Sequence, residues 1–184
     1  MSSDPLDLFE LLDRECARFK RDFADCAAEA DGLQQRMLGH ALVSRIAAFL
    51  LALEHVLYPP LLAIDIDVHD QLVEAHARLK RRAAEALLRY CGSASRAHQA
   101  LGAVQQAQQA YVDLLRRELY PTLYRSISLI ESALLAQEMQ EQLEANRCQA
   151  AALRRYQHPW DFENTRAPAL PGLQVEEHWT GVPR

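Results

Sequence analysis

Apolar residues recur at alternating steps of three and four along most of this 184-residue chain. That spacing places them on one face of an α-helix. The stripes predict four helices, over about residues 4–31, 33–58 and 68–90, and from Ser93 or Ser95 to Pro121. Asp4-Pro5 suits a helix start, Asp31-Gly32 and Gly92 suit helix ends, and Asp65 or Asp67 suits the start of the third helix.

The helical pattern continues after Pro121 and then changes character. Ser128 and Glu131 have the spacing of a capping box, and the stripe behind them predicts a fifth, amphipathic helix over residues 126–156. Residues 157–184 have four prolines, two tryptophans and no periodicity, which predicts an irregular tail. We expect the aromatic residues of this tail, Trp160, Phe162 and Trp179, to dock on the helices or on a second subunit.

One stretch of the sequence occurs twice. Residues 53–61 read LEHVLYPPL and residues 115–123 read LRRELYPTL, so each helical run ends in Leu-Tyr-Pro. A second echo precedes each copy, with CARFK at residues 16–20 and HARLK at residues 76–80. The chain therefore contains two copies of a helix pair, which predicts an up-down-up-down four-helix bundle over residues 1–125.

Composition and charge narrow the class of protein. The chain is 49% hydrophobic with only six glycines, which favours an all-α fold. A net charge of −5 leaves no basic surplus for nucleic acid. The start lacks a positively charged signal region, and the longest apolar run, Ile46–Leu53, is too short for a membrane span. The four cysteines form no CxxC motif, so we expect reduced thiols in a cytoplasmic protein.

The paired Leu-Tyr-Pro endings and the CARFK and HARLK echoes resemble the hemerythrin-like (HHE cation-binding) domains. The resemblance covers about residues 5–125. It implies a histidine in each of the first and third helices and a His-x-x-x-Glu pair in each of the second and fourth, together holding two irons. Carried over residue by residue, these ligand positions fall on Cys16, Phe49, Leu53, His76, Tyr111 and Leu115.

Most of those six positions lack a metal donor. A carboxylate-bridged di-iron centre needs five or more imidazole and carboxylate ligands, and the chain keeps only His76 and a thiol, Cys16. Moving the register by one residue brings Glu54 into a ligand position but replaces its histidine partner by Leu50. We therefore expect the site to be filled by core side chains, with His76 and Cys16 as the remaining candidate metal ligands.

Other histidines and charged residues have simpler interpretations. We expect His76 to be a buried histidine hydrogen-bonded to Tyr111 or Cys16, because an unpaired buried ring nitrogen is costly. Glu54 is expected on a solvated face, and Lys80, Arg81 and Arg82 on an exposed one. The remaining histidines that we assign to the surface are His40, His55, His69 and His98.

These observations predict a divergent hemerythrin-like protein without a cofactor, acting as a non-catalytic regulatory or interaction module. Two alternatives remain open. One is an oxygen, nitric oxide or redox sensor that binds iron or zinc through unusual ligands. The other is an assembly protein that associates with itself or a partner protein through the fifth helix and the tail. No nucleophile–base pair, phosphate-binding loop or paired carboxylates indicate an enzyme.

Overall fold

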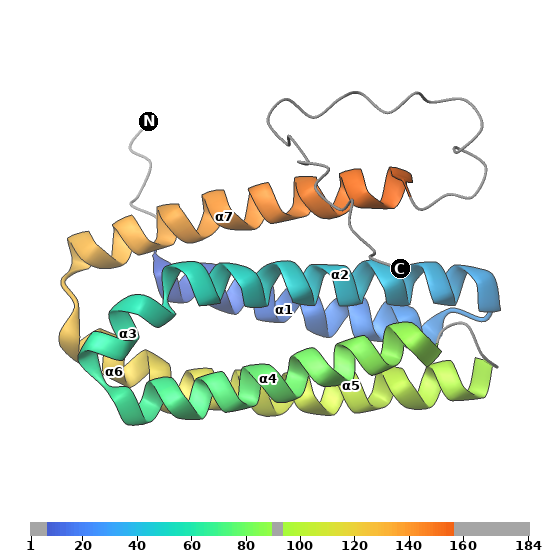
Figure 1. Ribbon diagram of the computed structural model, residues 1–184, viewed down its shortest axis with the longest axis horizontal. Helices are drawn as coiled ribbons and strands as arrows, with labels where there is room; N and C mark the ends of the chain where they lie inside the picture. Colours follow the sequence, from blue (N-terminus) through green and yellow to red (C-terminus); the bar gives the residue numbers. More distant parts are fainter. Residues whose placement is uncertain (1–6, 90–93, 157–184) are drawn as a thin grey trace, which may run out of the picture.

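A computed structural model of the protein describes residues 7–89 and 94–156. Within these ranges the side chains of residues 88–89, 94–97 and 149–156 are not described. The described residues are helical almost throughout and contain no strand (Figure 1). The all-α prediction is confirmed. The tail, whose docking we predicted, lies outside the described residues.

The first two long helices are α1, Leu8–Ala28, and α2, Gly32–Val56. Asp7 caps α1, since its carboxylate accepts the backbone N–H of Phe9 at 3.0 Å. The predicted start at Asp4-Pro5 lies outside the described residues. Asp31-Gly32 was predicted to end the first helix, and this is wrong. Asp31 caps the second helix instead, because its Oδ1 accepts the backbone N–H groups of Leu33 and Gln34.

Helix α2 ends at Val56, two residues before the predicted end at Tyr58, and the helical path resumes at once around Pro59. A short helix, α3, runs over Tyr58–Ile64 with Pro59 in its first turn, where a missing N–H costs nothing. The next long helix, α4, spans Ile66–Arg89. Asp65 caps it as predicted, accepting the backbone N–H groups of residues 67 and 68 at 3.1 Å.

The second Leu-Tyr-Pro copy ends in the same way. Helix α5, Ala94–Leu114, continues through a π-helical segment, η1, Leu115–Leu119, into α6, Tyr120–Ser126. The helical path therefore continues past Pro121, where the proline was expected either to end or to kink the helix. Ser95, one of the two residues expected to cap this helix, lies inside α5, while Ser93 and Gly92 lie outside the described residues. Like α3, α6 begins at the tyrosine of the motif and has seven residues. The residue after each short helix, Asp65 or Ile127, donates its backbone N–H to the carbonyl of a fully buried leucine, Leu61 or Leu123.

The fifth long helix is α7, Leu129–Tyr156, and its predicted capping box is confirmed. The Glu131 carboxylate accepts the Ser128 backbone N–H at 2.7 Å, while Ser128 Oγ accepts the Glu131 backbone N–H at 3.3 Å. One stripe of α7 is buried: Ser132, Ala136, Met139, Leu143 and Asn146. This stripe packs against α2 and α1, so within the chain the fifth helix covers the outside of the first helix pair.

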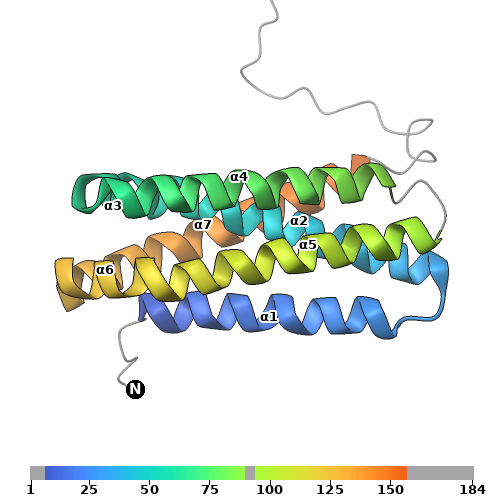
Figure 2. The ribbon, with the colours of Figure 1, turned by 90° about the horizontal axis from the view of Figure 1, so that it is seen from below.

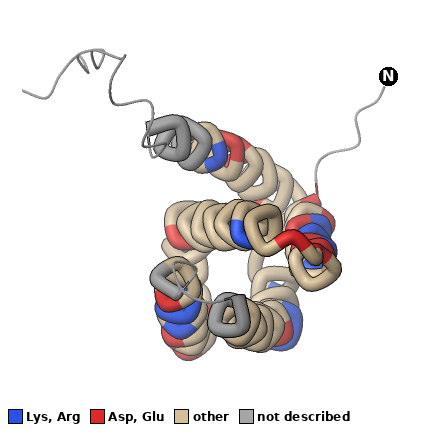
Figure 3. Tube along the Cα trace, turned by 90° about the vertical axis from the view of Figure 1, so that its right-hand side faces the viewer, with Lys and Arg blue, Asp and Glu red and all other residues tan. Residues whose placement is uncertain are grey.

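The four long helices α1, α2, α4 and α5 surround one hydrophobic core, and α7 lies across the outer side of α2 (Figures 2 and 3). Consecutive long helices run antiparallel (Figure 1). The predicted stripes supply the fully buried side chains, among them Phe19, Ile46, Leu53, Leu72 and Leu79. Burying an aliphatic or aromatic side chain of this size contributes roughly 1.5–3 kcal/mol, so the stripes account for the packing of the helices.

Helix α2 is the central and most apolar helix. Its best 18-residue window has a mean hydropathy of 1.5, so by length and composition it could cross a membrane. The prediction considered only the run Ile46–Leu53 and so underestimated the length of the apolar stretch in this helix. A core helix passes the same test, and α2 packs against α1, α4 and α7 here. The absence of a membrane partner stays a prediction.

Candidate functional site: a buried tyrosine–histidine chain

The six positions that the resemblance assigns to metal ligands are all buried. They come from all four of the helical segments that surround the core, α1, α2, α4 and α5 with η1. Their exposed fractions are 6% for Cys16 and His76, 2% for Phe49, 1% for Tyr111, and 0% for Leu53 and Leu115. The prediction that these residues face the core is confirmed.

Apolar side chains fill much of this layer. Phe49 packs edge-on against Phe19, with ring centroids 5.3 Å apart and an interplanar angle of 72°. Aromatic pairs in this arrangement contribute roughly 0.5–1.5 kcal/mol beyond the burial of their area. Leu53 and Leu115 belong to the same hydrophobic core. These three side chains, Phe49, Leu53 and Leu115, offer no lone pair to an ion.

The polar part of the site is a chain of three side chains. Tyr58 Oη lies 3.0 Å from His76 Nδ1 and 2.8 Å from Tyr111 Oη. Tyr58 is the tyrosine of the first Leu-Tyr-Pro motif, and α3 brings it across to α4 and α5. The predicted direct partner of His76, Tyr111 or Cys16, is therefore wrong. Tyr58 bonds to His76, and Tyr111 is one step further along the chain.

Burial favours the neutral form of all three groups. It raises the pKa of Tyr58 and of Tyr111, and it lowers the pKa of His76. A neutral His76 that carries its proton on Nε2 leaves Nδ1 free to accept from the Tyr58 hydroxyl. Tyr58 Oη can then accept from the hydroxyl of Tyr111. In this arrangement each hydroxyl hydrogen has an acceptor, and Nδ1 is not available as a metal ligand.

The outer end of the chain is less buried. His76 Nε2 lies 3.9 Å from Glu54 Oε2, and the Glu54 side chain is 49% exposed. Glu54 raises the pKa of His76, while burial and Lys80 lower it. The prediction of a solvated face thus holds for Glu54, but this carboxylate also lies beside the buried imidazole.

One other histidine belongs to the surroundings of Tyr58. The His69 ring packs edge-on against the Tyr58 ring at a centroid distance of 5.8 Å, and its Nδ1 lies 3.0 Å from Asp70 Oδ1. The His69 side chain is only 17% exposed, so its assignment to the surface is wrong. The exposed position of His40, His55 and His98 is confirmed, as is that of Lys80, Arg81 and Arg82.

No hydrogen bond in the described part of the protein joins Cys16 to these three side chains, although Cys16 contributes to the raised pKa of Tyr111. Burial raises the pKa of its thiol to about 12, with Arg116 lowering the pKa and Asp13 and Glu15 raising it. In the protein without a metal the thiol is therefore protonated near neutral pH, so it is not an activated nucleophile. Cys16, Cys26 and Cys148 are free, and Cys91 lies outside the described residues.

The tyrosine of the second motif binds differently from that of the first. Tyr120 Oη donates to Asp13 Oδ1 at 3.2 Å, and Arg116 donates to the same oxygen at 2.8 Å. The tyrosine of each motif therefore ties its helical segment to a different long helix, α4 in the first copy and α1 in the second. In both copies a seven-residue helix begins at the tyrosine, but the polar contacts of the two tyrosines differ.

Within the described residues, no group of three or more His, Cys, Asp and Glu side chains could hold a metal ion. Cys16 and His76, the two candidate ligands, share no hydrogen bond in that part of the chain. No protein-family model, curated protein or solved structure that was compared with the chain matches it. The family resemblance therefore depends on the sequence motifs.

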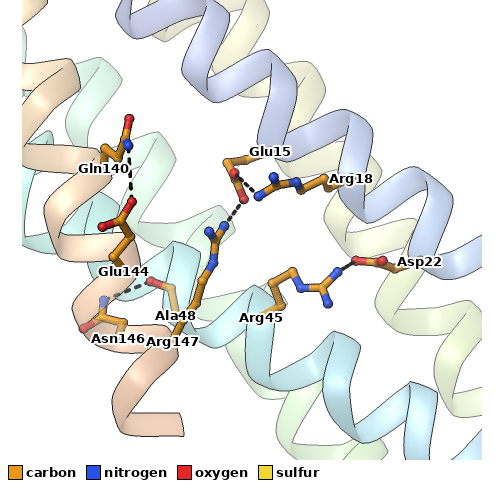
Figure 4. A network of polar contacts seen from close by, with 9 residues as sticks. All are labelled: Glu15, Arg18, Asp22, Arg45, Ala48, Gln140, Glu144, Asn146 and Arg147. Carbon is orange, nitrogen blue, oxygen red and sulfur yellow. Dashed lines mark hydrogen bonds and ion pairs between the residues drawn. The ribbon is translucent and has the colours of Figure 1, made fainter. Parts of the chain in front are cut away.

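A second polar network, which the sequence analysis did not identify, joins α7 to the bundle (Figure 4). Glu15 of α1 is 2% exposed and accepts from Arg18 at 2.9 Å and from Arg147 of α7 at 2.5 Å. Asn146 donates to the backbone carbonyl of Ala48 at 3.1 Å. The sequence contains one indication of this network, since Glu15 lies between Leu12 and Phe19 on the buried stripe of α1. Buried carboxylates are rare unless they are paired, so a partner could have been expected.

Proposed function

We propose that the chain is a divergent relative of the hemerythrin-like domains, with an up-down-up-down four-helix bundle whose metal centre has been replaced by packed core. In this proposal the protein is a non-catalytic regulatory or interaction module. The observation that carries the proposal is the burial of all six ligand positions in a chain that retains only one of the six expected donors.

The side chains at those positions support the loss of the metal. Phe49, Leu53 and Leu115 offer no donor atom. Cys16 could supply at most one thiolate, and Nδ1 of His76 is engaged by Tyr58. A carboxylate that bridges two irons would have to come from Glu54, which faces Nε2 at 3.9 Å and is half exposed.

Restoring the missing donors tests the kinship. The variant carries Cys16→His, Phe49→His, Leu53→Glu, Tyr111→His and Leu115→Glu and keeps His76. We expect this variant, refolded with ferrous iron, to bind close to two irons per chain, because the fold would place six donors around one point. Refolding with and without iron separates a failure to fold from a failure to bind. A variant with native helical content that binds no iron would contradict the kinship.

A second candidate function is assembly through the start of α7. Leu129, Ile130 and Leu134 are 88%, 75% and 60% exposed, and Tyr124 of α6 is 77% exposed. Large apolar side chains that gather on a surface mark interaction sites. Light scattering of the full chain tests this function: a dimer that dissociates in Leu129→Gln/Ile130→Gln supports assembly, and a monomer at all concentrations contradicts it.

A further inference from the structure

The first turns of α2 present apolar side chains that no described segment covers. Leu33, Met37 and Leu38 are 61%, 58% and 37% exposed. Leu33 and Met37 are four residues apart and so share one face of the helix. Downstream on α2 the corresponding residues are buried, including Ala48 and Ala52 at 6% and 0%.

The covered and uncovered parts of α2 belong to the same face. Met37 lies 11 residues before Ala48, which is about three helical turns, so the two residues point in nearly the same direction. Ala48 is the residue whose carbonyl accepts from Asn146 of α7. The two helices run antiparallel, and Tyr156, the end of α7, follows Asn146 by ten residues (Figure 1). Helix α7 therefore ends about level with Met37.

The chain itself continues from this point. Residues 157–184 follow the end of α7, and both tryptophans of the protein, Trp160 and Trp179, lie in this segment. Four residues of extended chain reach about 13 Å, so Trp160 can return from the end of α7 to the first turns of α2. Pro159 favours an extended residue before it, which suits such a return.

The chemistry of the segment matches the face of α2. In an extended chain alternate residues point to the same side, which groups Trp160 with Phe162 and Asp161 with Glu163. Residues 32–53 include two arginines and no acidic residue, and since Arg45 pairs with Asp22, Arg36 is the cation that remains for an acidic segment. Arg36, next to Met37, is exposed. We propose that residues 157–163 dock on the first turns of α2, with Trp160 and Phe162 covering Leu33 and Met37.

Tryptophan fluorescence of the full chain tests this docking, because only the segment after α7 contains tryptophan. A Trp179→Phe background leaves Trp160 as the single probe. We expect blue-shifted Trp160 emission and weak quenching by acrylamide. In Leu33→Gln/Met37→Gln we expect solvent-like emission and quenching increased severalfold. The replaced side chains are exposed, so circular dichroism should show an unchanged fold.

The matched control is Ile130→Gln/Leu134→Gln, which removes two exposed apolar side chains at the other end of α7 and should leave Trp160 protected. Solvent-like emission in the parent would overturn the proposal. Equal protection of Trp160 in both double variants would also overturn it, because the segment would then dock elsewhere. Protection that disappears on dilution would show that the segment comes from a second copy, which contradicts docking within one chain.

Discussion

Tyr58 Oη lies 3.0 Å from Nδ1 of His76, although the two residues belong to different helices, α3 and α4. The contact exists because the helical path continues through Pro59 and turns the tyrosine back into the core. It gives His76, the one histidine at a position that the resemblance assigns to a metal ligand, a buried phenol as its partner. With Nδ1 engaged by Tyr58, only Nε2 of His76, which lies beside the half-exposed Glu54, remains for a metal.

Replacing Tyr58 by phenylalanine tests the importance of this contact. The change removes one hydroxyl and leaves two buried partners, His76 Nδ1 and Tyr111 Oη, without it. We expect the free energy of unfolding in urea to fall by about 1–3 kcal/mol, the usual cost of an unsatisfied buried polar group. Tyr124→Phe, at an exposed tyrosine, is the control and should change stability little. Equal effects of the two substitutions would show that the contact does not contribute.

A second prediction concerns the apolar filling of the layer. Leu53 is fully buried, and Leu53→Glu would place a carboxylate there without a partner. We expect the variant either to lose about 2–7 kcal/mol of stability or to bind a proton with a strongly raised glutamate pKa. Leu134→Glu, at a 60% exposed position, is the matched control. A Leu53→Glu protein as stable as the parent at neutral pH, in the absence of metal, would disprove this placement.

The sequence was sufficient to predict the helical class, the stripes and the capping box at Ser128. It was less informative at Pro59 and Pro121, because a proline in the first turn of a new helix and a proline after the last turn of an old one produce the same local pattern. Asp31-Gly32 was ambiguous for a similar reason, since an aspartate beside a glycine can begin or end a helix. At Asp31 the local hydrogen bonds decide the case, because its carboxylate accepts the backbone N–H groups of Leu33 and Gln34.

The dependence of stability on pH should reveal His76. Burial lowers the pKa of its imidazole in the folded protein, so the unfolded chain takes up the proton first as the pH falls through about 6.5. The contribution of His76 to stability is therefore present above this pH and is lost progressively below it. We expect His76→Gln to flatten the stability profile between about pH 5 and 7, the range in which an ordinary histidine titrates. His55→Gln, at an exposed histidine, should keep the slope, and an unchanged slope in His76→Gln would contradict the account.

The attachment of α7 should depend on Arg147. Its guanidinium is one of two partners of the buried Glu15 carboxylate, so Arg147→Met leaves this charge with Arg18 alone. We expect a loss of roughly 1–3 kcal/mol, as for other hydrogen bonds to charged groups. Arg82→Met, which breaks the exposed pair with Glu85, should cost about 0–1 kcal/mol. If both changes cost the same, the buried pair does not hold α7.

The candidate site shows what a sequence pattern cannot supply. Cys16, His76 and Tyr111 were predicted to be buried from helical spacing alone, and they are. Their hydrogen-bond partners depend on how α3 crosses the end of the bundle, which spacing does not encode. Tyr58 was therefore treated only as part of a helix-ending motif. The same holds for His69, which is partly buried and packs against the Tyr58 ring.

The metal content of the protein tests the central claim most directly. The chain, expressed with iron available and purified without chelator, should contain much less than one iron per molecule and show no absorption from an oxo-bridged pair of irons. Only one of six expected donors is present, and losing a single supporting partner of a ligand already weakens metal binding about 10- to 100-fold. Near-stoichiometric iron or zinc that is lost in both Cys16→Ser and His76→Ala would support the sensor alternative instead. Two irons per chain would contradict the account outright.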